Sequence, residues 1–411
     1  MATILAYTSP ALGHLLPMCA LLAELSGRGH TVHVRTLSAG LDIARQLGFA
    51  AERIDPRIEA IEIDDWKAAN PRDALKLGVS SFGRRAGYET ADVAAAVHQV
   101  RPDALLVDVN CWGAQSAAQA GSVPWASFAP YTLPLRAAGV PPFGLGLPPW
   151  TGVVGRLRDA AVRALVVRPL EKIMLPPINR VRAEVHLPQA DSMDEFLRCA
   201  PLILLTSGKP FQYPATEWGD AVQMIGPCVM ETDGGGVPDW LAEVDRPIIL
   251  VTTSSEKQAD AELAAVAVRA LAGEPVHVVV TMPSGVPPDL KSAANVTVCQ
   301  FVPHGLVLDR AICAVTHGGM GATQKALARG VPVCVVPYGR DQLEVARRVD
   351  VAGCGTRLPA RRLTPDRLRE KVREAVGMAA GARRVAAGFA ETGGVEYGAD
   401  LFEQRILGLA S

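Results

Sequence analysis

Short apolar runs alternate with longer segments of helical period along this chain, and the pattern occurs twice. Apolar runs of this kind are typical of parallel strands that are buried on both faces and joined by crossover helices. In the first half we expect strands at 3–8, 31–36, 104–109, 124–128 and 202–206. In the second half we expect them at 248–252, 276–281, 296–301, 312–316 and 333–336. The sequence therefore predicts an α/β protein with two doubly wound, Rossmann-like domains.

The length and the distribution of prolines predict where the two domains meet. The 411 residues exceed one ordinary hydrophobic core and suit two domains of about 200 residues. The segment 207–247 contains Pro210, Pro214, Pro227, Pro238 and Gly234-Gly235-Gly236, a composition that resists regular structure. We therefore expect domains at 1–206 and 248–394, with 207–247 as the linker between them. The remainder, 395–411, has helical periodicity and is expected to pack on one domain or across both.

Composition limits the partners and the compartment. Hydrophobic residues make up 49% and charged residues 20%, with a net charge of -1, which argues against a nucleic-acid partner. The N-terminus does not resemble a signal peptide, and no run approaches the 18 apolar residues of a membrane span. The eight scattered cysteines suit buried, reduced thiols. We expect a cytoplasmic protein without a membrane span, and a homodimer is compatible with the sequence.

Two segments, 56–90 and 130–180, fit the alternation poorly and are rich in aromatic residues. Insertions of this kind in a regular lobe suggest a wall around an apolar ligand, although the same side chains could only pack the insertions onto the lobe. With Trp112, which follows an expected strand, the candidates for contact with an apolar ligand are Trp66, Phe82, Tyr88, Trp112, Tyr131, Phe143 and Trp150.

A glycine-rich turn follows the expected strand 312–316. It reads His317-Gly318-Gly319-Met320-Gly321 and leads into a helical segment. A turn without side chains lets an anion approach the backbone, and the helix that follows directs free N–H groups and its positive dipole end at that anion. A ring nitrogen of His317 could donate to a phosphate oxygen. The turn predicts a diphosphate site, although a doubly wound fold can also use such a turn for packing.

Two further motifs flank this turn: Phe301-Val302-Pro303-His304 before it and Pro337-Tyr338-Gly339-Arg340-Asp341-Gln342 after it. Together the three motifs resemble the nucleotide-sugar signature of the family 1 glycosyltransferases. The resemblance extends from the first strand to the C-terminal helix, and it is closest to the bacterial enzymes that decorate antibiotics and other secondary metabolites. It implies the GT-B fold, with a cleft between two domains, and transfer of a sugar from a nucleotide diphosphate to a hydroxyl of a small apolar acceptor.

The same resemblance implies roles for individual residues of the second domain. Phe301 would stack on the base, and the backbone at Val302 would hydrogen-bond the base edge. Asp341 and Gln342 would contact sugar hydroxyls. The stretch VTTSSEKQ resembles a second phosphate loop, although Ser and Thr also cap helices without any ligand. The residues expected to hold the diphosphate are Thr253, Ser254, Ser255, His317, Gly318, Gly319 and Gly321.

One position departs from the family pattern. Many members have a glutamate that accepts hydrogen bonds from the ribose hydroxyls, and this chain has Lys325 there. A lysine cannot accept those bonds, so a ribose 2'-hydroxyl would lose a partner. The departure favours a dTDP-sugar over a UDP-sugar as donor. Ala322 also replaces a common hydroxyl residue, which leaves Thr323 as the expected side-chain donor to the diphosphate.

His14 follows the first expected strand and stands at the start of a helix, at the carboxyl edge of the sheet where open α/β folds bind ligands. Inverting sugar transfer needs a base, and histidine suits that task near neutral pH. His14 matches the family's catalytic histidine, and Asp108 matches its partner aspartate, which would hold the other ring nitrogen. A structural histidine and an aspartate that caps the helix from Trp112 are the alternatives. Asp64 and Asp65 are less suitable because they lie in an insertion.

We expect no metal and no cofactor apart from the nucleotide-sugar co-substrate. The chain has no Asp-x-Asp pair and no His/Cys cluster with zinc spacing. Three alternatives share this architecture. A nicotinamide dehydrogenase fits poorly because the first turn reads SPALGH where that class has GxGxxG. A nucleotide-sugar epimerase would have no use for an acceptor pocket. A non-catalytic accessory protein would keep the fold without the chemistry.

Overall fold

The computed structural model describes residues 1–68, 71–230, 236–256, 258 and 260–409. Within this part of the chain the first lobe contains a seven-stranded sheet of order β3-β2-β1-β4-β5-β6-β7, in which every neighbouring pair is parallel. Its strands are β1 (Thr3–Tyr7), β2 (Thr31–Thr36), β3 (Ala50–Arg53), β4 (Ala104–Asp108), β5 (Trp125–Ala129), β6 (Ile203–Leu205) and β7 (Val222–Met224).

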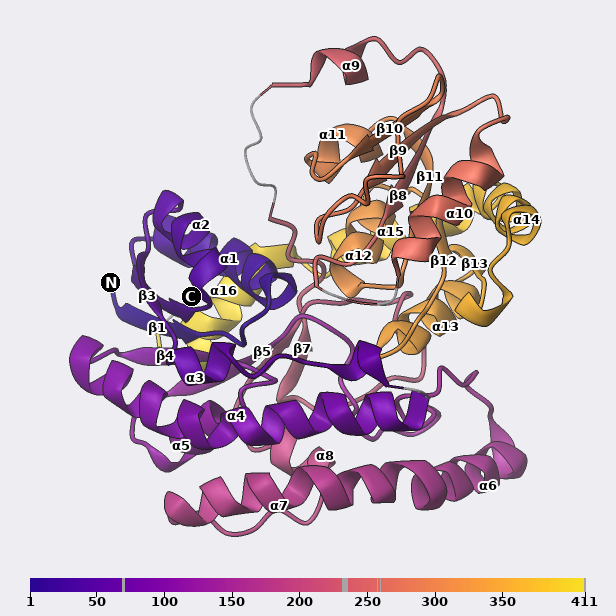
Figure 1. Cartoon of the computed structure of the whole chain (residues 1–411). Coiled ribbons are helices and arrows are strands. Elements are labelled where there is room, and N and C mark those ends of the chain that lie inside the picture. The colour runs from indigo at the N-terminus through magenta and orange to yellow at the C-terminus, as the bar shows by residue number, and fades with distance from the viewer. Residues whose placement is uncertain (69–70, 231–235, 257, 259, 410–411) are drawn as a thin grey trace.

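Helices cover both faces of this sheet (Figure 1). Successive residues of a strand point to opposite faces, so Ile4 and Ala6 pack under one helical layer and Leu5 and Tyr7 under the other. The first layer contains α1 (Leu12–Gly27), η1 (Ser38–Gly40) and α2 (Leu41–Gln46). The second contains α3 (Pro56–Glu59), α4 (Pro71–Val100), α5 (Trp112–Ala120), α7 (Arg168–Glu184) and α8 (Met193–Leu197). The turn η2 (Asp65–Lys67) precedes α4, while α6 (Gly152–Val162) and a π-helical turn, η3 (Arg163–Val167), lead into α7.

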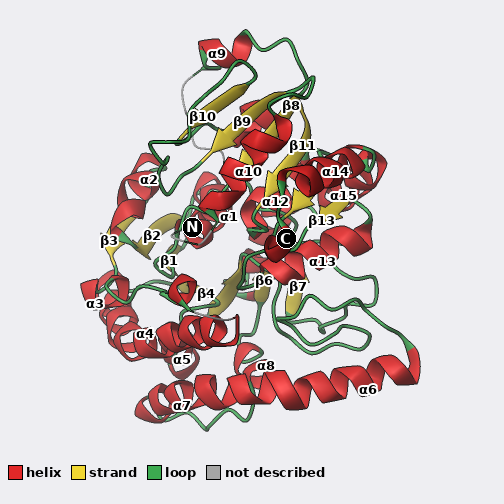
Figure 2. Ribbon diagram, turned by 45° about the vertical axis from the view of Figure 1, so that its right-hand side comes forward, coloured by secondary structure: helices red, strands yellow, loops and turns green. Residues whose placement is uncertain are grey.

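The second lobe repeats the arrangement (Figure 2). In the described residues its sheet has six parallel strands of order β10-β9-β8-β11-β12-β13. They are β8 (Ile248–Thr252), β9 (His277–Thr281), β10 (Val296–Cys299), β11 (Ala311–Thr316), β12 (Val333–Val335) and β13 (Gly355–Arg357). The helices are α9 (Asp239–Ala242), α10 (Ala261–Leu271), α11 (His304–Leu308), α12 (Met320–Ala328), α13 (Gln342–Ala352), η4 (Ala360–Arg362), α14 (Pro365–Val376) and α15 (Ala379–Glu391).

The last helix, α16 (Gly394–Arg405), returns to the first lobe. Figure 1 shows it beside α1, near the N-terminus. Leu401 and Phe402 are buried in the same core cluster as α1, and Arg28 of the α1 C-cap forms ion pairs with Asp400 and Glu403 at 2.6 and 2.7 Å. The first lobe is therefore built from both ends of the chain.

Strands β3, β7 and β13 were not expected, and each lies at an edge of its sheet. Strand β7 falls inside the segment expected to be the interdomain linker, 207–247, and it pairs with β6. Gly234 and Gly235 of that segment lie outside the described residues, as do positions 410 and 411. The segments 56–90 and 130–180, read as irregular insertions, contain the start of α4 and most of α6 and α7.

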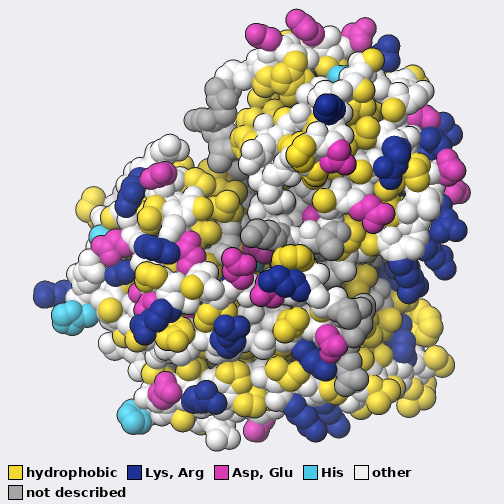
Figure 3. All heavy atoms as spheres, viewed as in Figure 1, with side chains coloured by type: hydrophobic (Ala, Val, Ile, Leu, Met, Phe, Trp, Pro, Cys, Tyr) yellow, Lys and Arg dark blue, Asp and Glu magenta, His cyan; other side chains and the backbone are white. Residues whose placement is uncertain are grey.

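The surface carries charges of both signs (Figure 3). Hydrophobic side chains gather at the lower right of that view, around α6, where Val153, Val154 and Leu157 are exposed. None of the helices in the described ranges is long and apolar enough to cross a membrane.

Candidate active site

The carboxyl ends of the two sheets open into one cleft of about 1610 Å³. Ser9 and Asn110 follow β1 and β4 on the first-lobe side, and Thr253 and His317 follow β8 and β11 on the second-lobe side. Open parallel sheets bind ligands at this edge because crossover connections leave a crevice there. Both lobes thus direct their ligand-binding edges at the same space.

His14 and Asp108 form a close pair on the first-lobe side. His14 lies in the first turn of α1, where its Nδ1 is 2.7 Å from Asp108 Oδ2, and its side chain is 18% exposed to the cleft. Asp108 ends β4 and is fully buried. Its carboxylate also accepts from Ser9 Oγ at 3.2 Å and from the Asn110 backbone N–H at 2.8 Å. Because the carboxylate is fixed in this way, the imidazole is held with Nε2 toward the cleft.

Opposing effects set the pKa of His14. Burial lowers this pKa, but the charge and hydrogen bond of Asp108 outweigh burial, so the pKa lies above its usual value. Glu256 and Asp341 raise it further, and both belong to the second lobe. A proton on Nδ1 shared with Asp108 leaves Nε2 as the acceptor, which is the tautomer that a general base needs.

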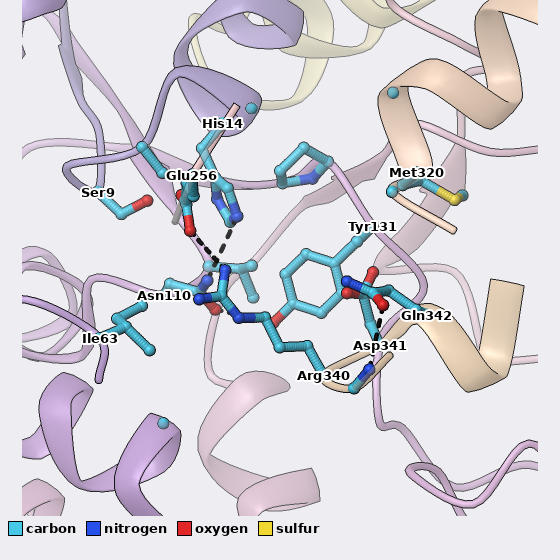
Figure 4. Close-up of a pocket in the computed structure, with 18 of the residues that line it drawn as sticks. Ser9, His14, Ile63, Asn110, Tyr131, Glu256, Met320, Arg340, Asp341 and Gln342 are labelled. Carbon is cyan, nitrogen blue, oxygen red and sulfur yellow. Dashed lines mark hydrogen bonds and ion pairs between the residues drawn. The ribbon is translucent and has the colours of Figure 1, made fainter. Parts of the chain in front are cut away.

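Asn110 completes this edge and was not expected from the sequence. Its Nδ2 is 3.5 Å from His14 Nε2, and its Oδ1 accepts from the Tyr131 hydroxyl at 2.8 Å. Figure 4 shows His14, Asn110 and Tyr131 together at the cleft. The amide therefore lies where an acceptor hydroxyl would approach the imidazole. Its place two residues after Asp108, at the same strand end, is the signal that could have identified it.

The glycine turn faces His14 from the second lobe. Gly318 has a φ of +93°, and Gly319 is the N-cap of α12. A Cβ on Gly319 would meet Nε2 of His317 at 2.5 Å, so a larger residue here would displace the imidazole ring. The first N–H groups of a helix have no partner inside the helix. Gly319 and Gly321 both line the cleft, so these groups are available to an anion there.

Two polar atoms beside the turn are buried without a hydrogen-bond partner among the described residues: Thr253 Oγ1 and His317 Nδ1. Burial lowers the pKa of His317, which favours the neutral ring, although Asp260 opposes that effect. A buried polar group without a partner is costly, so both atoms are available to a ligand in the cleft, although His317 Nδ1 also lies 3.9 Å from Asp260 Oδ2. Ser255 also lines the cleft, whereas Ser254 Oγ already accepts from the Glu256 backbone N–H and from Gln258 Nε2, both at 3.1 Å.

Two residues expected to contact the donor have other partners. Thr323 lies on the buried face of α12, where its Oγ1 is 3.2 Å from Thr316 Oγ1, so it does not reach the cleft. Gln342 lines the cleft, but both ends of its side-chain amide already have partners. Its Oε1 accepts from the backbone N–H of Tyr338 at 2.7 Å, and its Nε2 donates to Gln258 at 2.6 Å. Asp341, by contrast, directs its carboxylate into the cleft. Phe301 is 59% exposed at the cleft and can stack on a planar ring.

The aromatic residues expected to contact an apolar ligand do not all lie in the cleft. Tyr88 and Trp150 lie outside the cleft, where their rings stack on Arg57 and Arg158, each with 4.5 Å between the guanidinium carbon and the ring centroid. Tyr88 lies on α4, whose first part falls in the segment 56–90 that was expected to be an insertion. Of the aromatic residues expected to contact the acceptor, Trp66, Phe82, Trp112, Tyr131 and Phe143 line the cleft.

Lys325 lies at the cleft, and its Nζ donates to the Met230 carbonyl at 3.0 Å. Burial, with a smaller contribution from Lys325, lowers the pKa of His304 to about 4. The lysine therefore places positive charge beside His304, at the end of the 301–304 segment. The first two residues of that segment are expected to hold the nucleobase of the donor.

A two-lobed parallel fold, with a histidine–aspartate pair on one side of its cleft and a glycine turn on the other, has the architecture of the GT-B glycosyltransferases. Residues 263–393 match the family described as Erythromycin biosynthesis protein CIII-like, C-terminal domain. The 4'-demethylrebeccamycin synthase of Lentzea aerocolonigenes is 31% identical over 388 residues, 90% of this chain and 91% of that protein. The chain therefore belongs to the bacterial glycosyltransferases that act in natural-product biosynthesis.

Other relatives agree with this family. The L-demethylnoviosyl transferase of Streptomyces niveus is 26% identical over 87% of this chain and 85% of its own length. Among solved structures, the glycosyltransferase of kitacinnamycin has a TM-score of 0.76 and 25% identity, covering 98% of this chain and 99% of that one. The membership sets aside the dehydrogenase, epimerase and non-catalytic alternatives.

Proposed function

We propose that this enzyme moves a sugar, with inversion and without a metal, from a dTDP-sugar to a hydroxyl of a small apolar acceptor. The observation that carries the proposal is that His14 and the glycine turn face one cleft from opposite lobes. The acceptor oxygen bonds the anomeric carbon while the bond from that carbon to the diphosphate breaks. His14 Nε2 takes the hydroxyl proton, and Asp108 stabilises the cation. The N–H groups at the start of α12, His317 and Thr253 meet the charge on the departing diphosphate.

The remaining parts of the cleft suit the two substrates. Trp66, Phe82 and Phe143 supply an apolar wall for the acceptor, and Asp341 supplies an acceptor of hydrogen bonds for sugar hydroxyls. Proteins of the same fold include a glycosyltransferase solved in complex with DTDP and a spinosyn rhamnosyltransferase. These names support, for this chain, a thymidine-linked donor and a natural-product acceptor.

Lys325 makes the choice of nucleotide testable. With a lysine in place of a carboxylate, a ribose 2'-hydroxyl leaves water without gaining a hydrogen-bond acceptor. UDP should therefore bind more weakly than TDP by roughly 1 kcal/mol, or about five-fold in affinity. We expect calorimetry to show tighter binding of TDP than of UDP, and Lys325→Glu to reduce or reverse the difference. Lys325→Met is the matched control, because it removes the charge without adding an acceptor. Tighter binding of UDP by the unchanged enzyme would contradict the proposed donor.

Gly321 tests the diphosphate site without disturbing the fold. A Cβ at this position meets no atom within 4 Å and would project into the cleft. Alanine favours a helix over glycine by about 1 kcal/mol, so Gly321→Ala should not lower the melting temperature. We expect the methyl group to weaken TDP binding by about ten-fold or more, because it fills space that a diphosphate would occupy.

Gly13 provides the matched control for that variant. It lies in the first turn of α1, lines the first-lobe side of the cleft, and a Cβ there also meets no atom within 4 Å. Gly13→Ala should leave the TDP dissociation constant unchanged. Equal losses of TDP affinity in both variants would show that the diphosphate does not bind at the turn.

A further inference from the structure

The segment that carries Asp341 also contacts both loops of the first lobe that bring aromatic side chains to the cleft. We call residues 340–347 the bridging segment. It consists of the two residues before α13 and the first six residues of that helix, and it belongs to the second lobe. Two sets of polar contacts leave it for the first lobe, one at Arg340 and one at Glu344 and Arg347.

The first set is an ion network. The Arg340 guanidinium donates to both oxygens of Asp65, at 2.7 and 2.9 Å, and a third nitrogen donates to Glu256 at 2.5 Å. Asp65 begins η2 in the first lobe and directly precedes Trp66. This two-point contact fixes the orientation of the Arg340 guanidinium relative to the Asp65 carboxylate. A lysine, with a single ammonium group, would not do so. Figure 4 shows Arg340 and Glu256 meeting beside His14.

The backbone of Arg340 is unusual as well. Its φ is +54°, a conformation that non-glycine residues rarely adopt. Strained conformations of this kind persist where the surrounding structure fixes them, and they concentrate at functional sites. Here the two carboxylates on either side of the guanidinium hold the residue in place.

The second set fixes the loop that carries Phe143. Glu344 is 1% exposed, and its Oε1 accepts from the backbone N–H groups of Gly144 and Gly146, at 2.8 and 2.9 Å. Arg347 Nε donates to the Gly146 carbonyl at 2.8 Å. Gly146 has a φ of +56°, and a Cβ there would meet the Leu343 carbonyl oxygen at 2.3 Å. The loop can therefore lie against α13 only with glycine at this position.

The bridging segment is joined in turn to the loop expected to bind phosphate. Glu256 contacts Arg340, and Gln258 accepts from the Gln342 side chain at 2.6 Å. Thr253 and Ser255 lie in the same loop and line the cleft. A continuous chain of hydrogen bonds thus runs from the expected phosphate loop, through residues 340–347, to the loops that present Trp66 and Phe143.

We propose that Arg340 and Glu344 are positioning residues that couple nucleotide binding to the shape of the acceptor site. A nucleotide that fixes the positions of Thr253, Ser255 and Glu256 also fixes the bridging segment, and the bridging segment fixes the two aromatic loops. By thermodynamic linkage, the acceptor strengthens nucleotide binding by the same factor. This inference rests on the proposed placement of the donor in the second lobe and the acceptor in the first.

Hydrogen exchange with TDP as the probe tests the coupling at each loop separately. In the unchanged enzyme we expect saturating TDP to slow amide exchange in 61–68 and in 141–150. Asp65→Asn removes the charge that Arg340 binds and keeps the Arg340–Glu256 contact. It should abolish the TDP effect at 61–68 and keep it at 141–150. Gly146→Ala should give the opposite pattern. Both variants should bind TDP within about two-fold of the unchanged enzyme, because neither alters a group that contacts the nucleotide.

Asp64→Asn is the matched control, since Asp64 pairs with Lys67 inside the same turn of the first lobe. It should leave both TDP effects intact. In turnover, Asp65→Asn should raise the KM for a screened acceptor, measured at saturating donor, by about ten-fold, while TDP binding without acceptor stays unchanged, and Arg340→Lys should be intermediate. If TDP binds but protects neither loop, or protects both equally in every variant, the coupling is refuted. If only UDP binds, the same measurements with UDP decide the coupling, and only the proposed donor is refuted.

Discussion

His14→Ala is expected to lower kcat by about 10²–10⁴-fold while TDP binding stays within about two-fold of the unchanged enzyme. At the first-lobe edge, His14 can take a proton on Nε2, because its Nδ1 is hydrogen-bonded to Asp108. The proposed TDP site consists of second-lobe residues, so the substitution should remove the proposed base and leave the expected diphosphate contacts in place. Product formation from a panel of TDP-sugars and polyketide-like acceptors, followed by mass spectrometry, measures the first quantity, and calorimetry measures the second.

His98→Ala is the control for that experiment, since His98 lies exposed in the last turn of α4, away from the cleft. It should leave kcat unchanged. Retention of turnover by His14→Ala would refute the assignment of His14 as the base. A parallel loss of TDP affinity would instead indicate that the imidazole belongs to the donor site.

Asp108→Asn is expected to lower kcat by about 10²–10⁴-fold and to move the pH dependence of kcat/KM. The base acts when neutral, so kcat/KM should rise with pH through the pKa of His14. Asp108 raises that pKa and burial lowers it. Without the carboxylate charge, burial prevails, so the acid limb of the profile should shift to lower pH. The asparagine amide can also hold the ring in the wrong tautomer, which explains the fall in kcat at every pH.

Ser9→Ala is the matched variant for Asp108, because it removes only one donor to the carboxylate, at 3.2 Å. A loss of roughly 1 kcal/mol, or about five-fold in kcat/KM, is expected, with little movement of the acid limb. An acid limb that stays in place when Asp108 is replaced would show that another group titrates in that pH range.

The strands that the sequence predicted and those it did not differ in their surroundings. Strands β1, β4 and β8 lie inside the sheets, and apolar residues fill all but one terminal position of each, because both faces are covered. The edge strand β3 reads Ala-Ala-Glu-Arg and has one buried residue, so it carries no apolar run. Strand β7 has three residues and is partly exposed. The edge strand β10 was expected from the sequence, so position at an edge does not by itself hide a strand; β3 and β7 were not expected because neither carries an apolar run.

The site residues that belong to a local sequence motif could be predicted. His14 and the glycine turn follow strands and Asp108 ends one, and strand ends converge in this class of fold. The helix α12 shows where a motif is insufficient: Thr323 follows Ala322 in sequence, but helical geometry turns its side chain to the buried face. The contacts of Arg340 with Asp65 and of Glu344 with Gly146 join residues 275 and 198 positions apart. No local pattern in one sequence identifies such pairs.

The return of α16 to the first lobe affects how these enzymes can be recombined. A chimera made by one crossover near residue 230 would join this chain's first lobe to a foreign C-terminal helix. Ala399, Leu401, Phe402 and Ile406 would then be replaced at a surface shaped by Leu21, Leu25 and Ile225. A graft that carries α16 together with its own first lobe, through a second crossover at Gly393-Gly394, keeps that interface intact and exchanges the donor lobe alone.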